Sequence, residues 1–363
     1  MNWESRILSE NNLKPWCSSE SGSDRVFVMS PNQADQVATA PGTAPFESGT
    51  LNATVKSLIR QQVATWPMLR DAVIGLEKVE FKKFTVKGSE VFAQFNPARI
   101  VSTAAKVDAA TISKRPCFLC ADNLPPEEKG IAFGDRFVVL CNPFPVLKDH
   151  LVISSREHVP QAIEGNFGAM LDLAQDLGEN WFVLYNGPRC GASAPDHFHF
   201  QACSRAEVPL FQDFDFWLQR NSYEVGYVVN HNYRFNLMAC GGNERQKLVE
   251  WFGRAIGHLA AVTNSEVEPM LNLTATFQNG QWSVFILPRG KHRPACYDAE
   301  GDAKLTISPA AIDLAGVVVV PQPDHFARVT AADLENIFSE VGLSDDQLIE
   351  WLKRINSDKE MPR

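Results

Sequence analysis

The segment around residue 199 carries side chains suited to nucleophilic chemistry. His197, His199 and Gln201 are spaced two residues apart, and Phe198 and Phe200 stand between them. Successive side chains of a β-strand point to opposite faces of the sheet. The spacing therefore predicts a strand with both histidines and the glutamine on one face and the two phenylalanines buried on the other.

His199 is the candidate nucleophile of this strand. A neutral imidazole can attack phosphorus and form a phosphoramidate, provided that an acceptor such as a backbone carbonyl holds its other ring nitrogen. Gln201 is uncharged and cannot serve as a general acid, but its amide can donate to a phosphoryl oxygen and stabilise the growing charge. The alternative is a strand whose polar residues simply face solvent.

Small residues before this strand favour a bound anion. Gly191, Ala192 and Ser193 allow backbone N–H groups to approach a phosphate closely, and Asn186 opens the same loop. We predict substrate contacts from Asn186, Gly191 and Ser193. Turn formation without a ligand is the alternative reason for such glycines.

A basic run follows residue 288 in an otherwise acidic chain. Arg289, Lys291, His292 and Arg293 stand close together at the expected end of a strand, and such a cluster suggests phosphate binding. We predict that Arg289 and Lys291 contact the substrate, with Arg99 as a weaker candidate. A solvated loop is the alternative.

Cys117 and Cys120 form a C-x-x-C turn, which can present two thiolates to one tetrahedral metal ion. Two further ligands are needed. His158 follows Cys120 by 158 − 120 = 38 residues, and His197 follows His158 by 197 − 158 = 39 residues. Two cysteines and two histidines would suit a closed structural zinc site, whereas buried free thiols or a redox pair are the alternatives.

The composition bounds the class of protein. The 363 residues are 45% hydrophobic and 21% charged, as in ordinary globular proteins, and the net charge of −9 argues against nucleic acid as a partner. No run of about 18 apolar residues is found, so no membrane span is expected. The polar segment 1–10 lacks the apolar stretch of a secretory signal. Eight scattered cysteines fit a reducing compartment, so we expect a cytoplasmic protein.

Strand and helix patterns are mixed along the chain without regular strand–helix–strand alternation. Helices are expected at 53–76 with a break near Pro67, and at 169–177, 244–262, 331–338 and 345–355. Strands are expected at 25–29, 79–86, 89–95, 131–140, 150–155, 181–185, 197–203, 223–229, 234–238, 271–278, 281–287 and 317–320, with a hairpin turn at Asn279-Gly280. The mixture favours an α+β fold with mostly antiparallel sheets. No internal sequence repeat is evident.

These motifs together resemble the histidine-triad superfamily, in the branch that includes galactose-1-phosphate uridylyltransferase, diadenosine tetraphosphate phosphorylase and GDP-hexose phosphorylases. Hydrolases of the superfamily usually carry a third histidine on the strand, whereas the transferase and phosphorylase branch has glutamine there, as Gln201 stands here. Residues 196–202 look most similar to the GDP-L-galactose phosphorylase version. Asp196 departs from the uridylyltransferase pattern by lengthening the spacing between Pro195 and His197. Looser matches extend the resemblance from about residue 90 to residue 347.

The resemblance implies two histidine-triad-like halves with antiparallel sheets flanked by helices. We place them at 51–205 and 206–363, after an irregular arm at 1–50. It further implies that His199 becomes nucleotidylated and that Gln201 contacts the phosphoryl group. The residues that match the zinc ligands of zinc-bearing members are Cys117, Cys120, His158 and His197. Members are often dimeric, so a homodimer is also expected.

We therefore expect a nucleotidyltransferase or phosphorylase. It would cleave a dinucleoside polyphosphate or a nucleotide sugar at the α-phosphorus, hold the nucleotide on His199, and pass it to inorganic phosphate or a sugar phosphate. The resemblance favours adenine or guanine as the base. A hydrolase of the same superfamily and a nucleotide-binding protein without turnover are the two alternatives.

Overall fold

The structure, a computed structural model, describes residues 50–96, 115–214, 226–230 and 233–358. The arm predicted at 1–50, apart from Thr50, the strand predicted at 25–29 and the candidate Arg99 lie outside these residues. None of the described helices is long and apolar enough to cross a membrane.

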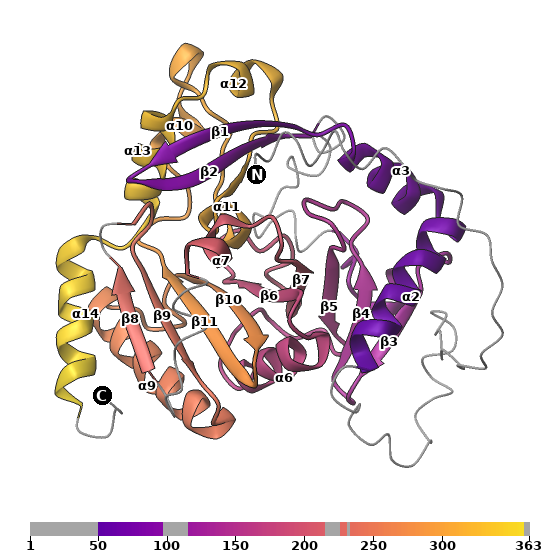
Figure 1. The fold of residues 1–363 in the computed structure, drawn as a ribbon, viewed down its shortest axis with the longest axis horizontal. Helices are drawn as coiled ribbons and strands as arrows, with labels where there is room; N and C mark the ends of the chain where they lie inside the picture. Colours follow the sequence, from indigo (N-terminus) through magenta and orange to yellow (C-terminus); the bar gives the residue numbers. More distant parts are fainter. Residues whose placement is uncertain (1–49, 97–114, 215–225, 231–232, 359–363) are drawn as a thin grey trace.

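A nine-stranded antiparallel sheet forms the centre of the fold (Figure 1). Its strands are, in spatial order, β3 (Gly130–Phe133), β4 (Phe137–Cys141), β5 (Leu151–Ser155), β7 (His199–Ser204), β6 (Trp181–Asn186), β10 (Leu271–Gln278), β11 (Gln281–Pro288), β9 (Leu237–Gly242) and β8 (Gly226–Asn230). The first five strands precede residue 205 in the chain and the last four follow it. The two groups meet where β6 pairs with β10, so one sheet runs through both halves.

The two halves repeat one strand topology. In the first half, β4 and β5 lead through helix α6 (Phe167–Leu177) to β6 and β7, and the spatial order is β4-β5-β7-β6. In the second half, β8 and β9 lead through helix α9 (Arg245–Thr263) to β10 and β11, in the order β8-β9-β11-β10. The predicted α+β fold with two similar halves is thus observed, although the sequence shows no repeat. The domain boundaries at residues 50 and 205 stay predictions.

Helices cover one face of the large sheet. α2 (Thr50–Thr65), α6, α9 and α14 (Asp345–Ser357) share a hydrophobic core with sheet residues such as Ile153, Phe200 and Leu273. Along α9 the buried positions recur at helical spacing, as its amphipathic sequence predicts. α2 ends just before Pro67, which begins α3 (Pro67–Leu76), because a proline needs no N–H partner in the first turn of a helix.

The other face of the large sheet is covered by a second sheet and short helices. β1 (Glu80–Val86), β2 (Ser89–Phe95) and β12 (Val317–Val319) form a three-stranded sheet in which β12 runs parallel to β2. This sheet, α7 (Pro209–Asp213), α11 (Ala311–Leu314) and α13 (Ala331–Val341) bury Leu237, Phe285 and Leu287 of the second half. The remaining short elements are η3 (Ala121–Asn123), α10 (Ala295–Asp298), η4 (Gly301–Ala303) and α12 (Pro323–Arg328).

The predicted hairpin is confirmed, and three strand predictions need correction. Asn279 and Gly280 both have positive φ, 50° and 76°, as a tight turn between β10 and β11 requires. The strand predicted at 131–140 is two strands, β3 and β4, because the chain turns at Gly134 with φ 54°. β9 begins at Leu237 rather than at Arg234, whose guanidinium donates to the carbonyls of Glu90 and Ala315.

The third correction concerns the histidine strand. β7 begins at His199, so His197 precedes the strand instead of belonging to it. The backbone N–H of His197 donates to Ala194 O across a turn. Phe198 and Phe200 are buried in the core as expected. His197 therefore lies away from the strand face that holds His199 and Gln201.

Candidate active site

A cavity of about 670 Å³ lies over the first half of the large sheet. Its floor includes Leu140, Val152 and Gln201, which are paired neighbours on β4, β5 and β7. The loop after β6 forms one wall. The second half supplies another wall, with residues His292, Arg293, Ser308 and Ala310. The site is thus built from both halves of the chain.

His199 lies at the start of β7 and lines this cavity. Its Nδ1 is 2.9 Å from the backbone carbonyl of His197. A neutral ring that donates from Nδ1 carries a lone pair on Nε2, and Nε2 has no hydrogen-bond partner in the described part of the chain. Burial, the largest influence, lowers the pKa of His199 to about 4. The imidazole is therefore neutral near pH 7, the form that can act as a nucleophile.

Gln201 is oriented by His150, to which no role was assigned from the sequence. The Nδ1 of His150 accepts the N–H of Val146 at 3.1 Å, so the proton of the neutral ring is on Nε2. That Nε2–H donates to the Oε1 of Gln201 at 2.7 Å. With Oε1 engaged, the Gln201 amide presents its N–H groups to a ligand. His150 is thus a positioning residue for a hydrogen-bond donor in the cavity.

Asn186 ends β6 and is held in the same way. Its Oδ1 accepts from Asn272 Nδ2 at 2.7 Å and from the backbone N–H of Ala311 at 2.9 Å. The amide N–H groups are again the ones left for a ligand in the cavity. Buried Gln161 links Asn186 to His199, because it donates to both Asn186 O and His199 O and accepts from His199 N.

The loop after β6 approaches the second half closely at Gly191. This residue has φ 93°, and a Cβ there would lie 2.7 Å from the Cβ of Ala310. Only glycine therefore fits both the backbone conformation and the contact. Ser193 of the same loop is exposed and lines the cavity.

Of the basic run 289–293, only His292 and Arg293 line the cavity, whereas Arg289 and Lys291 were the predicted contacts. Arg289 is 1% exposed and donates to the carbonyls of Val341, Pro309, Lys291 and His292 and to Asn272 Oδ1. Lys291 forms an ion pair with Glu340 on the surface. Neither residue lines the cavity, whereas Arg293 does. Arg289 instead supports the site from behind, through Asn272 and Asn186.

Among the described residues that line the cavity, Arg293 is therefore the one arginine or lysine available to an anionic ligand. Its Nε donates to Ser308 Oγ at 3.2 Å, and its guanidinium stacks 4.1 Å from the ring of Tyr297. Ser308 and Tyr297 also line the cavity. A stacked guanidinium keeps several N–H donors in a fixed plane, which suits phosphate recognition.

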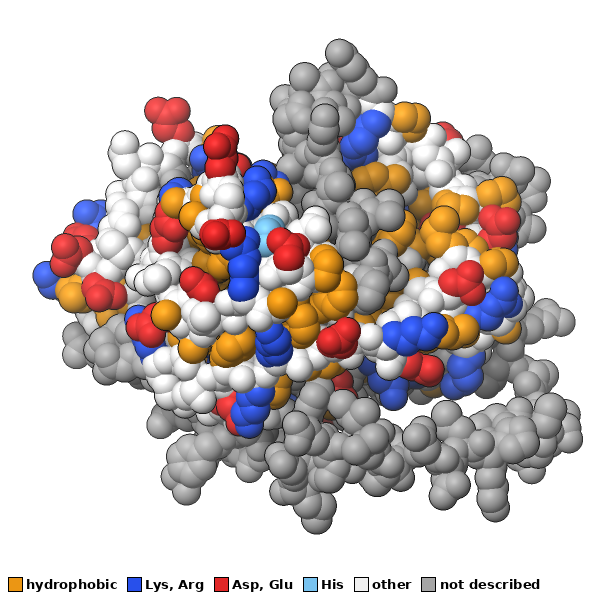
Figure 2. All heavy atoms as spheres, turned by 90° about the horizontal axis from the view of Figure 1, so that it is seen from above, with side chains coloured by type: hydrophobic (Ala, Val, Ile, Leu, Met, Phe, Trp, Pro, Cys, Tyr) orange, Lys and Arg blue, Asp and Glu red, His pale blue; other side chains and the backbone are white. Residues whose placement is uncertain are grey.

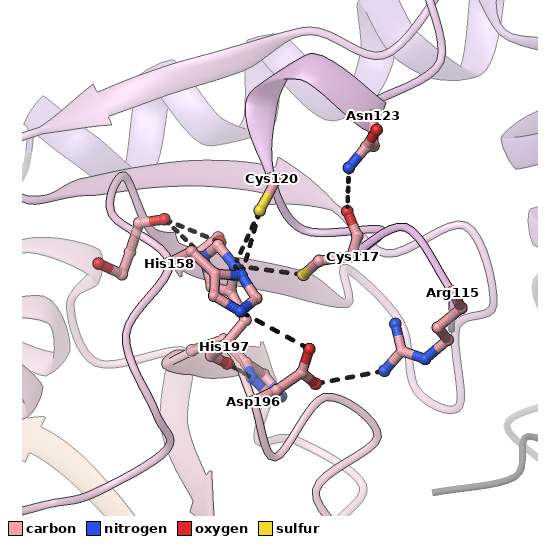
Figure 3. A network of polar contacts seen from close by, with 10 residues as sticks. Arg115, Cys117, Cys120, Asn123, His158, Asp196 and His197 are labelled. Carbon is pink, nitrogen blue, oxygen red and sulfur yellow. Dashed lines mark hydrogen bonds and ion pairs between the residues drawn. The ribbon is translucent and has the colours of Figure 1, made fainter. Parts of the chain in front are cut away.

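The four predicted metal ligands converge at one point next to the cavity (Figure 3). Their ligand atoms all lie within 4.8 Å of one another. The distance from Cys117 Sγ to His197 Nδ1 is 3.3 Å, that from Cys120 Sγ to His158 Nδ1 is 3.2 Å, and that from Cys120 Sγ to His197 Nδ1 is 3.6 Å. Metal–ligand bonds of about 2.0 to 2.3 Å in a tetrahedron give edges of this length.

Outer contacts orient these ligands toward one another. The Nε2 of His197 lies 2.8 Å from the carbonyl of Ser155 and donates to it, so Nδ1 is the atom available to a metal. Asp196 lies between His158 Nε2, at 3.9 Å, and the guanidinium of Arg115, at 3.3 Å (Figure 3). Burial, followed by the neighbouring Cys117, raises the pKa of the Cys120 thiol to about 11. A bound cation would reverse that shift, because it stabilises the thiolate. The group could therefore hold a metal ion.

Comparison with known proteins gives two similarities. Residues 58–204 match a family described as a domain of unknown function, DUF4922. Among curated protein sequences none matches the chain. The yeast Ap4A phosphorylase Apa2 in complex with AMP is similar in structure, with a TM-score of 0.53, 14% identity, and coverage of 79% of this chain and 96% of that one. The same yeast protein in complex with Ap4A gives a TM-score of 0.52, 14% identity, and coverage of 79% and 97%.

The chain has the fold of Ap4A phosphorylase Apa2. The fold implied by the histidine-triad resemblance is thereby confirmed. Within this Ap4A phosphorylase fold, the cavity brings together five of the residues that the sequence singled out, His199, Gln201, Asn186, Gly191 and Ser193. Their roles stay predictions. Neither Gln161 nor His150 was assigned a role from the sequence.

Proposed function

We propose that the chain is a nucleotide phosphorylase that works through a nucleotidylated His199. The observation that carries the proposal is the hydrogen bond from His199 Nδ1 to His197 O, which leaves the lone pair of Nε2 for a ligand in the cavity. The shared fold supports it, because the similar yeast protein is an Ap4A phosphorylase that binds AMP and Ap4A. The proposed substrate is a dinucleoside polyphosphate or a nucleotide sugar.

The reaction proceeds in two displacements. His199 Nε2 attacks the α-phosphorus, a P–N bond forms, and the bond from phosphorus to the bridging oxygen of the leaving group breaks. An oxygen of inorganic phosphate or of a sugar phosphate then attacks the same phosphorus, and the P–N bond breaks to release the product. Each step inverts phosphorus, so the two together give retention.

The residues around His199 stabilise the charge that develops on the phosphoryl oxygens. The Gln201 amide donates from one side because His150 holds its oxygen. Asn186 donates from the end of β6, and Arg293 supplies a positive charge from the second half. Groups fixed before the reaction stabilise a transition state better than groups that must reorient.

We also propose that Cys117, Cys120, His158 and His197 bind zinc. Two thiolates and two imidazoles in a tetrahedron suit this ion, and four protein ligands leave no open position, so its function would be structural. When bound, the ion crosslinks the C-x-x-C turn to the segment that precedes β7. Since His197 O accepts from His199, the crosslink also fixes the nucleophile.

A homodimer and a cytoplasmic location remain parts of this proposal. The seven cysteines of the described residues are all free thiols, which supports a reducing compartment. The acceptor is proposed to be inorganic phosphate or a sugar phosphate.

The covalent step is tested by intact-protein mass spectrometry. The purified protein is incubated without phosphate with ADP-glucose, diadenosine tetraphosphate, GDP-mannose, GDP-galactose or UDP-glucose. We expect a mass gain of one nucleoside monophosphate, its loss when phosphate is added, and no gain for His199→Ala. His258→Ala is the matched control, because His258 lies on α9 and pairs with Asp358.

Two results would contradict the proposal. Undiminished turnover by His199→Ala would exclude the covalent route. Loss of the added mass in buffer alone, at the same rate as with phosphate, would identify a hydrolase instead.

A further inference from the structure

Glu128 is a buried carboxylate for which the proposed reaction has no use. It lines the cavity, is 6% exposed, and accepts no hydrogen bond from any described residue. Burial is the only cause that raises the pKa of this carboxyl, to about 7. An unpartnered carboxylate costs free energy in such a place. The geometry thus indicates that a ligand supplies the missing donors.

The register of the sheet gives the separation between Gln201 and Gly130, which follows Glu128 by two residues. Gly130 pairs with Leu140, Leu140 pairs with Val152, and Val152 pairs with Gln201. These four residues form one row on the cavity face, and three interstrand spacings span about 14 Å. Glu128 lies two residues before Gly130, just outside β3, and lines the same cavity. A nucleotide whose α-phosphate contacts Gln201 would therefore extend along this row with its base toward Glu128.

The lining of the cavity includes several large apolar side chains. Trp66, Phe118 and Phe144 belong to it together with Met68 and Leu124. Met68, Phe118 and Phe144 are 51%, 45% and 41% exposed, which is unusual for such large hydrophobic side chains. Seen from above, hydrophobic side chains gather on the right, on the side of α2 and α3 (Figure 2). These surfaces offer a flat aromatic base a place to stack.

We infer that Glu128 recognises guanine in the bound nucleotide. The inference rests on one part of the proposed function, namely that a nucleotide binds in the cavity. A carboxylate offers two acceptors side by side, and the N1–H and N2–H₂ groups of guanine are two adjacent donors. Adenine presents one donor and one acceptor on that edge, and uracil presents a single donor between two acceptors. Guanine alone satisfies both oxygens of an ionised Glu128.

The substitution Glu128→Gln distinguishes a contact to the base from a contact to the ribose. A glutamine amide presents one acceptor and one donor, which is the complement of adenine rather than of guanine. The change is isosteric and removes a buried charge, so the fold is retained. If Glu128 instead contacted the ribose, Glu128→Gln would lower the affinity for every nucleotide by the same factor.

The experiment measures the Kd of GMP and of AMP by calorimetry for the wild-type protein, Glu128→Gln and Glu127→Gln. Glu127 is the control because it is the exposed neighbour of Glu128. We expect the wild type and Glu127→Gln to bind GMP roughly 10 to 100 times more tightly than AMP. Glu128→Gln should lose this preference or reverse it.

Two outcomes would overturn the inference. One is equal affinity of the wild type for GMP and AMP, or tighter binding of AMP. The other is an equal loss of both affinities in Glu128→Gln, which would indicate a ribose contact. Because the assay uses products and detects only binding, a preference for GMP without nucleotidylation of His199 would leave the inference standing while the proposed function failed.

Discussion

In the first half of the large sheet, β7 presents His199 and Gln201 to a cavity, whereas in the second half β11 presents Phe285 and Leu287 to a closed hydrophobic core. The comparison is direct because the residues share a row. Gln201 pairs with Leu184, Leu184 with Thr274, and Thr274 with Phe285. Gln201 and Phe285 therefore lie on the same face of one sheet, with β6 and β10 between their strands.

The two halves have the same strand topology. They differ in the side chains on the sheet and in the elements that pack against it. The sheet of β1, β2 and β12, with α11 and α13, packs on the second half and excludes a ligand there. Over the first half the corresponding space remains a cavity, bounded by the loops after β4 and β6 and by residues of α11 and β12 such as Ile312 and Val319. A repeated fold thus provides two similar sheet surfaces, of which one closes a hydrophobic core and the other lines a cavity.

The largest expected effects come from truncating the two matched residues. Phe285→Ala should lower the free energy of unfolding by about 3 to 5 kcal/mol, because the side chain is wholly buried. Gln201→Ala should lower kcat about 100-fold with little change in stability, because it removes one donor to the phosphoryl group. Denaturant unfolding and steady-state kinetics on both variants measure the contrast.

His150→Ala serves as the companion to Gln201→Ala. If His150 acts by orienting the amide, the double variant should be hardly slower than Gln201→Ala alone. Additive losses in kcat would show that His150 does not act by orienting Gln201. A stability loss in Gln201→Ala as large as that of Phe285→Ala would show that the two halves do not differ in the way described.

The four candidate metal ligands all belong to the first half, which is a further difference between the two halves. Cys117→Ser should release bound zinc and lower the melting temperature by roughly 5 to 10 °C, because the crosslink contributes to folding. Elemental analysis and thermal unfolding test this, with Cys296→Ser of the second half as the control. Cysteine variants that melt alike and contain the same amount of metal would rule out the zinc proposal.

The smallest expected effect is a pH dependence of stability that originates at Glu128. Its pKa is raised from 4.5 to about 7 in the folded protein, so between these values the folded state binds more protons than the unfolded state. Stability must therefore fall as pH rises from about 4.5 through 7. The difference in unfolding free energy between Glu128→Gln and the wild type should grow by about 1 to 3 kcal/mol between pH 5 and pH 8. A constant difference would show that the carboxyl is not buried as described.

Local patterns predicted most of the helices and strands, and two residues that line the cavity. The alternation around His199 placed this residue and Gln201 on one face because strand geometry is decided by neighbours in the chain. The same is true of the hairpin at Asn279-Gly280. The C-x-x-C turn likewise predicted a cluster that the fold brings together.

Contacts between segments far apart in the chain could not be predicted from local sequence patterns. Arg289 was predicted to contact substrate, but its acceptors come from Asn272, Pro309 and Val341, and only the folded chain shows that they enclose it. Gln161 acts through Asn186 and His199, 25 and 38 residues away. The pairing of β6 with β10 joins residues 86 apart, and no local signal specifies it.

The contact between Asn186 and Ala311 has a consequence for how the protein is made. The two residues are separated by 125 positions. A ribosome that adds about 5 to 20 residues per second needs roughly 6 to 25 seconds to cover that interval. For most of this time the nascent chain already contains His199 but lacks the backbone N–H of Ala311 that holds Asn186. The wall of the cavity at Asn186 is therefore expected to be completed only after most of the second half has been synthesised.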